Sequence, residues 1–451
     1  MKFASKMMLI VILILFAFIS GFTYRDINTG SGIGGAVDAI LAAANSLETT
    51  VDEAIKGPKV DLPPIETYWN TFNYIDRNYF GKRLDPAGKR LTSREMTYDA
   101  IRGMLKSLGD RYTRFLAPDD FSKMREENRG DFEGIGAELD VQNGRILIRK
   151  PIKGSPAIKA GLLAGDIILR VDEHFIQGMD INDVIKLIRG KGGTKVNLTI
   201  KRKDVPKPMV FTIVRGTIPF TIVESKMTDD SNKIGYIMLR QFNEKSDQQI
   251  GDALSDLEGK GMRGLVLDLR DNPGGLLDVA VEIGSRFIQD GSVVIIKQGD
   301  HENSLDIDPR QHDHKMYPLA VLINGYSASA SEILAGAIQD HKVGTIVGTD
   351  SFGKGLVQTI INLEDGSAVS ITTARYLTPS GRDVNKNKIH PDIVIDPAPL
   401  TPKQHNAVKN PDDIQITPDD DSNDVQLKAA VKFLNDRLGS NQAKAAIPEK
   451  S

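Results

Sequence analysis

Three serines lie close together at the point where a buried strand is expected to give way to a helix. Ser327, Ser329 and Ser331 belong to the stretch NGYSASASE, which ends at Glu332. The first turn of a helix stabilises negative charge, so a serine placed there could attack a carbonyl and leave a stabilised oxyanion. Ser329 and Glu332 also fit the S-x-x-E capping box, in which the serine only caps the helix. The spacing by itself does not decide which serine would react.

Lys354 is the base that such a serine could use. The chain contains no cysteine, and no histidine motif flanks the serines. A lysine accepts a proton only as the neutral amine, and burial in an apolar site lowers its pKa toward that state. Pairs of serine and lysine are a known variant of the catalytic triad. The alternative is a surface lysine in the glycine-rich turn Phe352–Gly355.

A second junction of this kind, Arg270–Gly275, follows a predicted buried strand at 264–269. Its two adjacent glycines leave backbone N–H groups free to face a ligand, which would suit half of an oxyanion hole. The alternative is a plain turn between a strand and a helix.

Motifs typical of nucleotide and metal sites fail in their context. Gly348–Lys354 matches the start of a P-loop, but Gly355 replaces the required Ser or Thr, and residues 356–361 predict a strand. The G-x-G-x-x-G at Gly30–Gly35 lacks the preceding strand of a dinucleotide site. The histidines between His301 and His314 lie in a polar loop without a partner at metal-ligand spacing. We therefore expect no metal, no nucleotide and no other cofactor.

The composition favours a globular protein of several domains. At 451 residues the chain is long enough for about three domains. Its 57 Lys and Arg against 60 Asp and Glu give a net charge of −3, without the basic excess that binding to nucleic acid needs. The absence of cysteine excludes disulfides, thiolate metal sites and a cysteine nucleophile.

The N-terminus predicts export. Lys2 and Lys6 precede an apolar run at residues 7–22, the pattern of a signal peptide or a signal anchor. The positive charges should stay in the cytoplasm, so the rest of the chain should lie in the cell envelope or periplasm. The sequence leaves open whether the run is cleaved or is kept as an anchor in the inner membrane.

Periodicity divides the rest of the chain into helical, β-rich and mixed parts. Apolar residues at helical spacing predict the first part, and short β-branched runs around one helix predict the second. Strands and helices then alternate, which indicates an α/β core. The predicted segments are a signal peptide or anchor at 1–24, a linker at 25–64, a helical region at 65–130, a small β-rich domain at 131–203, an α/β core at 204–397, and a Pro/Asp-rich linker with an amphipathic helix at 398–451.

Together, these motifs resemble the carboxy-terminal processing, or tail-specific, serine proteases. The serine stretch followed by the lysine of Phe-Gly-Lys-Gly is similar to that family's catalytic segments, and Arg270–Gly275 is similar to its Leu-Arg-x-Asn-Pro-Gly-Gly motif. Further similar stretches are Tyr376–Arg382, His390–Asp392, Gly134–Gly136 and Asp424–Leu427. The resemblance spans residues 65–440. It implies an α/β multidomain protein with a helical N-terminal region, a PDZ domain at 131–203 and a crotonase-like serine–lysine protease core.

The resemblance also implies roles for single residues. The matches are Ser329 to the nucleophile, Lys354 to the general base, Gln358 to the residue that orients the lysine, and the amides of Gly275 and Ala330 to the oxyanion hole. Asp340 matches an aspartate that matters in some members, although capping or an ion pair near the helix end explains it slightly better.

Gly134, Ile135 and Gly136 match the peptide-binding loop of the PDZ domain. The inward N–H groups of a glycine-rich loop can hold the terminal carboxylate of a peptide, while the adjacent strand edge pairs with the peptide. We therefore expect protein substrates with apolar C-termini. The resemblance further implies a homodimer supported by the terminal helices, and an activating partner is left open.

The predicted function is that of a serine endopeptidase of the cell envelope, which recognises protein C-termini and cleaves through an acyl-enzyme. A non-catalytic PDZ scaffold of envelope proteins is the alternative, although a scaffold would not need Ser329, Lys354 and Gln358 together with Gly275. An acyl-thioester enzyme of the crotonase type is a second alternative. It would need no serine–lysine pair, no PDZ domain and no export signal.

Overall fold

The computed structural model describes residues 65–79, 91–229, 231, 233–311, 314–397 and 423–445. The apolar run at 7–22, the linker predicted at 25–64 and the stretch 398–422 lie outside the described residues. The chain divides into two compact units, Met1–Thr92 and Ser93–Ser451. No helix in the described ranges is both long enough and apolar enough to cross a membrane.

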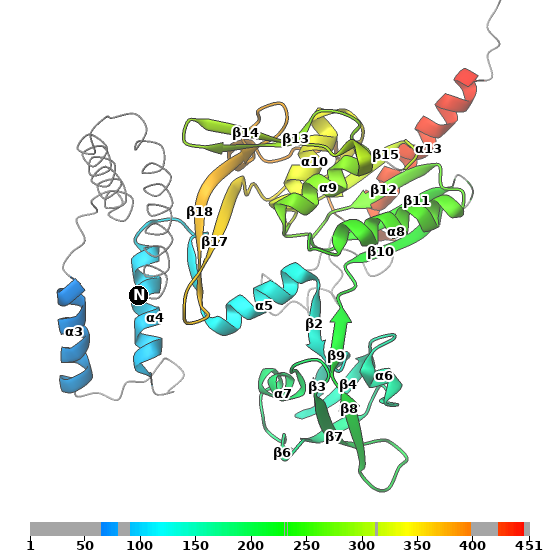
Figure 1. The fold of residues 1–451 in the computed structure, drawn as a ribbon. Coiled ribbons are helices and arrows are strands. Elements are labelled where there is room, and N and C mark those ends of the chain that lie inside the picture. Colours follow the sequence, from blue (N-terminus) through cyan, green and yellow to red (C-terminus); the bar gives the residue numbers. More distant parts are fainter. Residues whose placement is uncertain are drawn as a thin grey trace, which may run out of the picture. The chain divides into compact units, whose positions relative to one another are not determined.

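A six-stranded sheet forms the main sheet of the second unit (Figure 1). Its order is β10-β11-β12-β15-β16-β19, with β10 antiparallel to β11 and all other neighbours parallel. Strands β11, β12 and β15 are buried along their whole length, as expected for a parallel sheet covered on both faces. The strands are β10 (Val223–Asp229), β11 (Ile234–Leu239), β12 (Gly264–Asp268), β15 (Leu319–Ile323), β16 (Thr345–Gly348) and β19 (Ile393–Val394).

Helices cover both faces of the main sheet, because alternate strand residues point to opposite sides. One face shares an apolar core with α8, α9 and α10, and the other face packs against α13. The buried residues of α13 in that contact are Leu427, Ala430, Leu434 and Leu438. The helices are α8 (Ser246–Gly259), α9 (Leu277–Phe287), α10 (Ala330–Asp340) and α13 (Val425–Ala445). The α/β core expected from the alternating pattern is confirmed.

A second sheet of the core is antiparallel. Its order is β1-β18-β13-β14, and β17 also pairs with β18. Because β17 begins directly after Gly355, the G-x-x-x-x-G-K stretch leads into a strand and not into the helix that a P-loop requires. The strands are β1 (Arg114–Leu116), β13 (Ser292–Gln298), β14 (His301–Asp306), β17 (Leu356–Asn362) and β18 (Ala368–Leu377).

The β-rich domain has its own sheet and its own apolar core. The sheet order is β3-β4-β5-β7-β8, with β6 beside β5, and helix α7 packs on it. The pairing of β8 with β7 carries the sheet past the boundary predicted at residue 203. Strands β2 and β9 pair with each other where the chain enters and leaves the domain (Figure 1). The elements are β2 (Asp131–Gly134), β3 (Ala137–Gln142), β4 (Arg145–Pro151), β5 (Ile167–Val171), β6 (His174–Phe175), α7 (Ile181–Ile188), β7 (Lys195–Lys201), β8 (Met209–Val214) and β9 (Gly216–Pro219).

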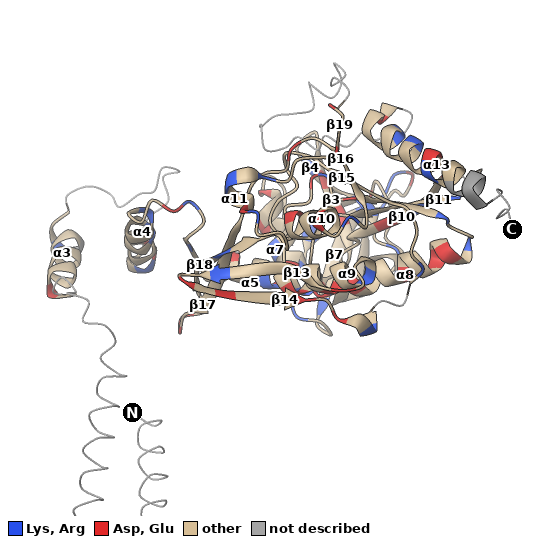
Figure 2. Cartoon of the chain, turned by 90° about the horizontal axis from the view of Figure 1, so that it is seen from above, with Lys and Arg blue, Asp and Glu red and all other residues tan. Residues whose placement is uncertain are grey.

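In the region predicted as helical, the described residues, 65–79 and 91–130, form three helices and one strand. The helices are α3 (Ile65–Asn78), α4 (Ser93–Lys106) and α5 (Pro118–Arg129). The strand β1, which the sequence did not predict, joins the antiparallel sheet by pairing with β18. Acidic and basic residues are interspersed along the helices and strand edges (Figure 2), as the near-neutral composition leads one to expect.

Candidate active site

Ser329 stands at the turn between strand β15 and helix α10. It is the N-cap of the helix, and its φ of 54° lies in the left-handed region that non-glycine residues rarely adopt. Residues in such strained conformations persist only where their surroundings hold them, and they cluster at functional sites. Here the Ser329 N–H donates to the carboxylate of Glu332 at 2.9 Å. This bond is the glutamate half of the predicted capping box.

The three serines of this turn differ in their surroundings. The Ser327 hydroxyl donates to the carbonyl of Leu269 at 2.8 Å, and the Ser331 hydroxyl donates to the carbonyl of Asn272 at 2.9 Å. Both of these serines are fully buried, whereas Ser329 is partly exposed. The structure thus leaves Ser329 as the accessible serine of the turn, a choice that the spacing could not make.

The glycine turn after β12 comes very close to the start of α10. A side-chain carbon on Gly274 would lie 2.8 Å from the nitrogen of Ala330, and φ at Gly274 is 96°. A side-chain carbon on Gly275 would lie 1.9 Å from the carbonyl oxygen of Phe242. Both positions therefore require glycine.

The backbone N–H groups of Gly275 and Ala330 lie on these two neighbouring segments. Within the described part of the chain, neither group donates a hydrogen bond. Asn272 fixes the spacing of the segments, because its carbonyl accepts the N–H of Ala328 at 3.0 Å. Two unused donors on adjacent rigid segments are what an oxyanion hole requires.

The carboxylate of Glu332 joins the Ser329 turn to the Lys354 loop. Glu332 is fully buried. Its Oε2 accepts the N–H groups of Ser329 and Lys354, each at 2.9 Å. Its Oε1 accepts the N–H of Gly353 and the hydroxyl of Ser351, each at 2.6 Å. One oxygen atom thus binds the backbone of both predicted catalytic residues.

The hydroxyl of Tyr376 forms a second link between the same two segments. It hydrogen bonds to the carbonyl of Lys354 and lies 3.2 Å from the carbonyl oxygen of Ser329. Burial, together with the neighbouring Glu332, raises the pKa of Tyr376 well above its ordinary value. The hydroxyl therefore keeps its proton and remains a donor.

The side chain of Lys354 lies in surroundings that favour the neutral amine. Burial lowers the pKa of Lys354 most, the positive charge of Arg114 lowers it further, and Glu332 acts in the opposite direction. The Nζ atom lies 5.1 Å from the centre of the Tyr112 ring, a cation–π contact. Among the described residues, no hydrogen bond joins the side chains of Lys354 and Ser329; such bonds often form only once substrate is bound.

The other predicted residues of the core have different hydrogen-bond partners among the described residues. Gln358, on β17, donates to the hydroxyl of Thr372 at 3.4 Å, so its role in orienting Lys354 stays a prediction. Asp340 ends α10 and accepts a hydrogen bond from Arg382 at 3.2 Å. This is the ion pair near the helix end that the sequence favoured for Asp340.

Several residues that contact Ser329 or Lys354 were not predicted from the sequence. Glu332 was identified only as a capping residue, and Tyr376 only as part of a family motif. Both lay in stretches that the motifs marked, so a signal was present. Tyr112 and Arg114 come from the segment predicted as helical, where no local pattern points to the active site.

Gly134, Ile135 and Gly136 lie together at one groove of the β-rich domain. The groove has a volume of about 390 Å³ and is also lined by Ile185 and Ile188 of α7. Strand β3, on its other side, is the edge strand of the sheet, so its backbone can pair with an added peptide. The predicted peptide-binding residues therefore stand beside both an apolar wall and a strand edge.

Comparison with known proteins gives matches to the α/β core and to the β-rich domain. The model of peptidase family S41 matches residues 233–395, and a PDZ domain model matches residues 147–202. The chain is 39% identical over 363 residues to the carboxy-terminal-processing protease of Bartonella bacilliformis, covering 75% of this chain and 83% of that protein. It is 37% identical over 360 residues to the carboxy-terminal processing protease CtpA of Bacillus subtilis, covering 79% and 75%. A solved structure, the photosystem II D1 C-terminal processing protease, is 31% identical with a TM-score of 0.43, covering 74% of this chain and 93% of its own.

The substitution Arg114→Gln should raise the pKa of Lys354, because it removes a positive charge that disfavours the ammonium form. NMR titration of lysines labelled with ¹³C at Cε measures this, with Lys354→Arg to assign the signal. We expect Lys354 of the parent to lose its proton at lower pH than the exposed lysines. In Arg114→Gln, the titration midpoint of Lys354 should shift toward that of the exposed lysines.

Arg145→Gln, at an exposed position of the β-rich domain, is the control and should leave Lys354 unchanged. Identical Lys354 titrations in the parent and in Arg114→Gln would contradict this electrostatic assignment.

Proposed function

Because this chain belongs to the carboxy-terminal processing serine proteases of peptidase family S41 and carries a PDZ domain, we propose that Ser329 and Lys354 form its catalytic dyad. The observation that carries the proposal is the single Glu332 oxygen that accepts the N–H groups of both residues. A protein that only bound peptides would gain nothing from a strained serine tied to a lysine of lowered pKa.

Catalysis begins when the Ser329 hydroxyl attacks the scissile carbonyl and gives its proton to the neutral amine of Lys354. The carbonyl oxygen becomes an oxyanion, which accepts hydrogen bonds from the N–H groups of Gly275 and Ala330. Lys354 returns the proton to the leaving amine as the peptide bond breaks, which leaves an ester on Ser329. Water then gives a proton to Lys354 and attacks the ester. Lys354 passes that proton to the Ser329 oxygen as the acid leaves, which restores the serine and the neutral amine.

The contact between Lys354 and Tyr112 suits this cycle. The attraction between a positive charge and an aromatic ring holds the ammonium form over Tyr112. The neutral amine lacks that attraction, so loss of the proton frees the side chain to turn toward Ser329. The form of Lys354 that can act as a base is thus the form that the ring holds least.

Substrates are recognised at their C-termini by the PDZ domain. The terminal carboxylate accepts hydrogen bonds from the loop Gly134–Gly136, and the peptide backbone pairs with the edge of β3. The last side chain packs beside Ile185 and Ile188, which favours apolar C-termini. Unstructured proteins that end in apolar residues are therefore the substrates that fit this groove.

The protein works outside the cytoplasm and as a homodimer. Export is supported by Lys2, Lys6 and the apolar run at 7–22, which also supplies an anchor in the membrane if it is not cleaved. A dimer is supported by helix α3, whose Trp69 and Tyr74 are 54% and 70% exposed. Exposed aromatic side chains gathered on one helix are typical of surfaces that another protein chain covers.

Ser329→Ala and Lys354→Ala should each abolish proteolysis, because each removes a group that forms or breaks a bond. We expect cleavage of an unstructured protein with an apolar C-terminus to fall by about 10⁴-fold or more, measured by gel and mass spectrometry. Ser304→Ala and Lys260→Ala, at exposed positions, are the controls and should cleave like the parent.

Cleavage that survives both Ser329→Ala and Lys354→Ala would refute the dyad. Binding of the protein substrate by the parent without any cleavage would instead favour the PDZ scaffold.

Gly134→Leu should weaken the preference for a free C-terminal carboxylate. Gly134 is the better position to change, because a side-chain carbon there has its nearest neighbour at 3.6 Å, whereas one on Gly136 would meet Ser155 at 2.5 Å. The parent should cleave a substrate with a free C-terminus about tenfold faster than its amidated form, the worth of a charge-assisted hydrogen bond. In Gly134→Leu the two rates should approach each other.

Val210→Leu, at an exposed position of the same domain, should keep the parental ratio of the two rates. Equal cleavage of the free and amidated substrates by the parent would argue against recognition of the carboxylate.

A further inference from the structure

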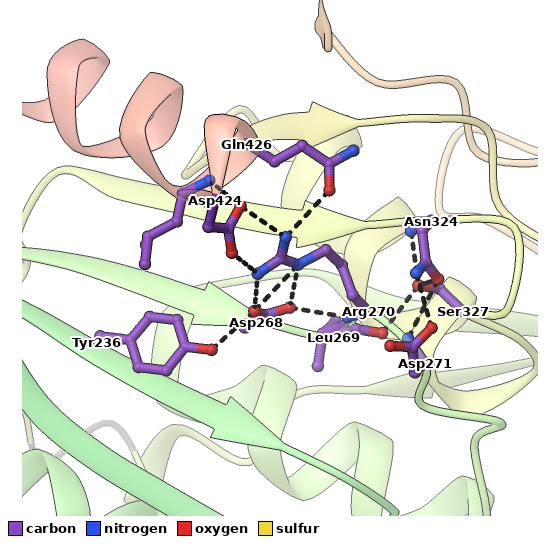
Figure 3. Close-up of polar contacts among 10 residues, drawn as sticks. Tyr236, Asp268, Leu269, Arg270, Asp271, Asn324, Ser327, Asp424 and Gln426 are labelled. Atoms are coloured by element: carbon purple, nitrogen blue, oxygen red, sulfur yellow. Dashed lines mark hydrogen bonds and ion pairs between the residues drawn. The ribbon is translucent and has the colours of Figure 1, made fainter. Parts of the chain in front are cut away.

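Arg270, the first residue of the glycine turn, is a buried cation that contacts the start of the C-terminal helix (Figure 3). Its guanidinium donates to Asp268, at the end of β12, over 2.6 to 3.1 Å. It also donates to both carboxylate oxygens of Asp424, at 2.7 and 3.0 Å, and to Gln426 at 3.0 Å. Asp424 directly precedes α13 and stands 154 positions after Arg270.

The charged groups of this cluster depend on one another. Two buried carboxylates, Asp268 and Asp424, face one guanidinium, and Tyr236 donates to Asp268 at 2.8 Å. Burial acts to raise the pKa of Asp424, but hydrogen bonds and charge from Arg270 outweigh it and keep that pKa below its ordinary value. Loss of one partner from such a cluster leaves an uncompensated buried charge. The remaining groups would then have to move.

Packing of α13 on the sheet does not itself need Asp424. The helix buries Leu427, Leu434 and Leu438 against the sheet, and burial of apolar surface supplies the free energy of docking. Apolar contacts have little directional preference, whereas a guanidinium fork accepts a carboxylate only in a narrow range of orientations. Asp424 therefore adds a defined geometry to a contact that the leucines already stabilise.

The position of Arg270 determines where the backbone of the following turn, 271–275, begins. Asp271 exchanges two hydrogen bonds with Asn324, at 3.1 and 2.8 Å, and has a strained φ of 57° (Figure 3). The side chain of Asn272 accepts the N–H of Gly274 at 2.9 Å. Hydrogen bonds thus hold both Asp271 and Asn272 in place. A shift of Arg270 would thus be carried along the backbone to Gly275.

We propose that Asp424 is a positioning residue of the protease reaction: through Arg270 it fixes the turn that presents the Gly275 N–H to the oxyanion. The inference rests on the proposed role of Gly275 and extends the site to a residue that touches no substrate. The C-terminal helix thereby has a catalytic consequence as well as a packing role.

The test compares Asp424→Asn with a matched variant of the same helix, Asn435→Ala, in the full-length chain. Asn435 donates to Asp229 at 3.1 Å, so its removal weakens the docking of α13 without touching Arg270. Asp424→Asn should lower kcat by about tenfold to a hundredfold, the effect of a displaced catalytic group, and leave KM within about twofold. Asn435→Ala should keep the parental kcat even though it lowers the thermal stability, with all proteins assayed well below their melting temperatures.

Hydrogen exchange measured by mass spectrometry gives a readout that does not depend on activity. The peptide covering residues 270–276 should exchange faster in Asp424→Asn and at the parental rate in Asn435→Ala. Gln426→Met removes one acceptor of Arg270 and should show the same pattern with smaller changes, so it decides the matter if Asp424→Asn does not fold.

Parental kcat and parental exchange of the turn in Asp424→Asn would overturn the inference. An equal fall of kcat in Asn435→Ala would overturn it as well, because the effect would then follow helix docking in general. A parent that cleaves no substrate would refute the proposed function instead, and the exchange rates alone would then decide whether Asp424 fixes the turn.

Discussion

The buried carboxylate of Glu332 is the interaction on which the arrangement of the site depends. A carboxylate without access to water is tolerated only when hydrogen bonds satisfy its oxygens. Here the donors come from two separate segments, the turn at Ser329 and the loop at Ser351–Lys354. Moving the segments apart would leave buried acceptors without partners. The geometry of the two proposed catalytic residues, Ser329 and Lys354, is therefore secured by backbone contacts, which leave their side chains available for chemistry.

The topology of the sheet explains why these segments meet. Strands β12 and β15 are parallel neighbours, so the glycine turn after one and the serine turn after the other leave the sheet at the same edge. The Lys354 loop follows β16, the next strand of the sheet. From the opposite face, α13 reaches the glycine turn through Asp424 and Arg270. Residues far apart in the chain thus reach one place because consecutive crossovers return to one sheet.

The sequence predicts the chemistry of the site better than its contacts. The serines and the glycines were found because they lie at predicted junctions between a strand and a helix, and Lys354 because it lies in a glycine-rich turn ahead of a predicted strand. Spacing alone did not choose among the three serines. The family resemblance pointed to Ser329, and burial and hydrogen bonds set Ser329 apart from Ser327 and Ser331 in the structure. Arg114 was missed because its strand is only three residues long and pairs with Ser370, far along the chain. Likewise, the sheet of the β-rich domain ran past residue 203 because β8 is specified by its pairing with β7.

The most direct measurement is the single-turnover rate at which Glu332→Gln hydrolyses a saturating peptide substrate. Each oxygen of Glu332 accepts at least one backbone N–H, so the amide group of glutamine would place a donor against a donor in either orientation. We predict a rate at least about a hundredfold below that of the parent, with the folded state verified by circular dichroism. A folded Glu332→Gln protein that hydrolyses the peptide at the parental rate would contradict a site held together by this carboxylate.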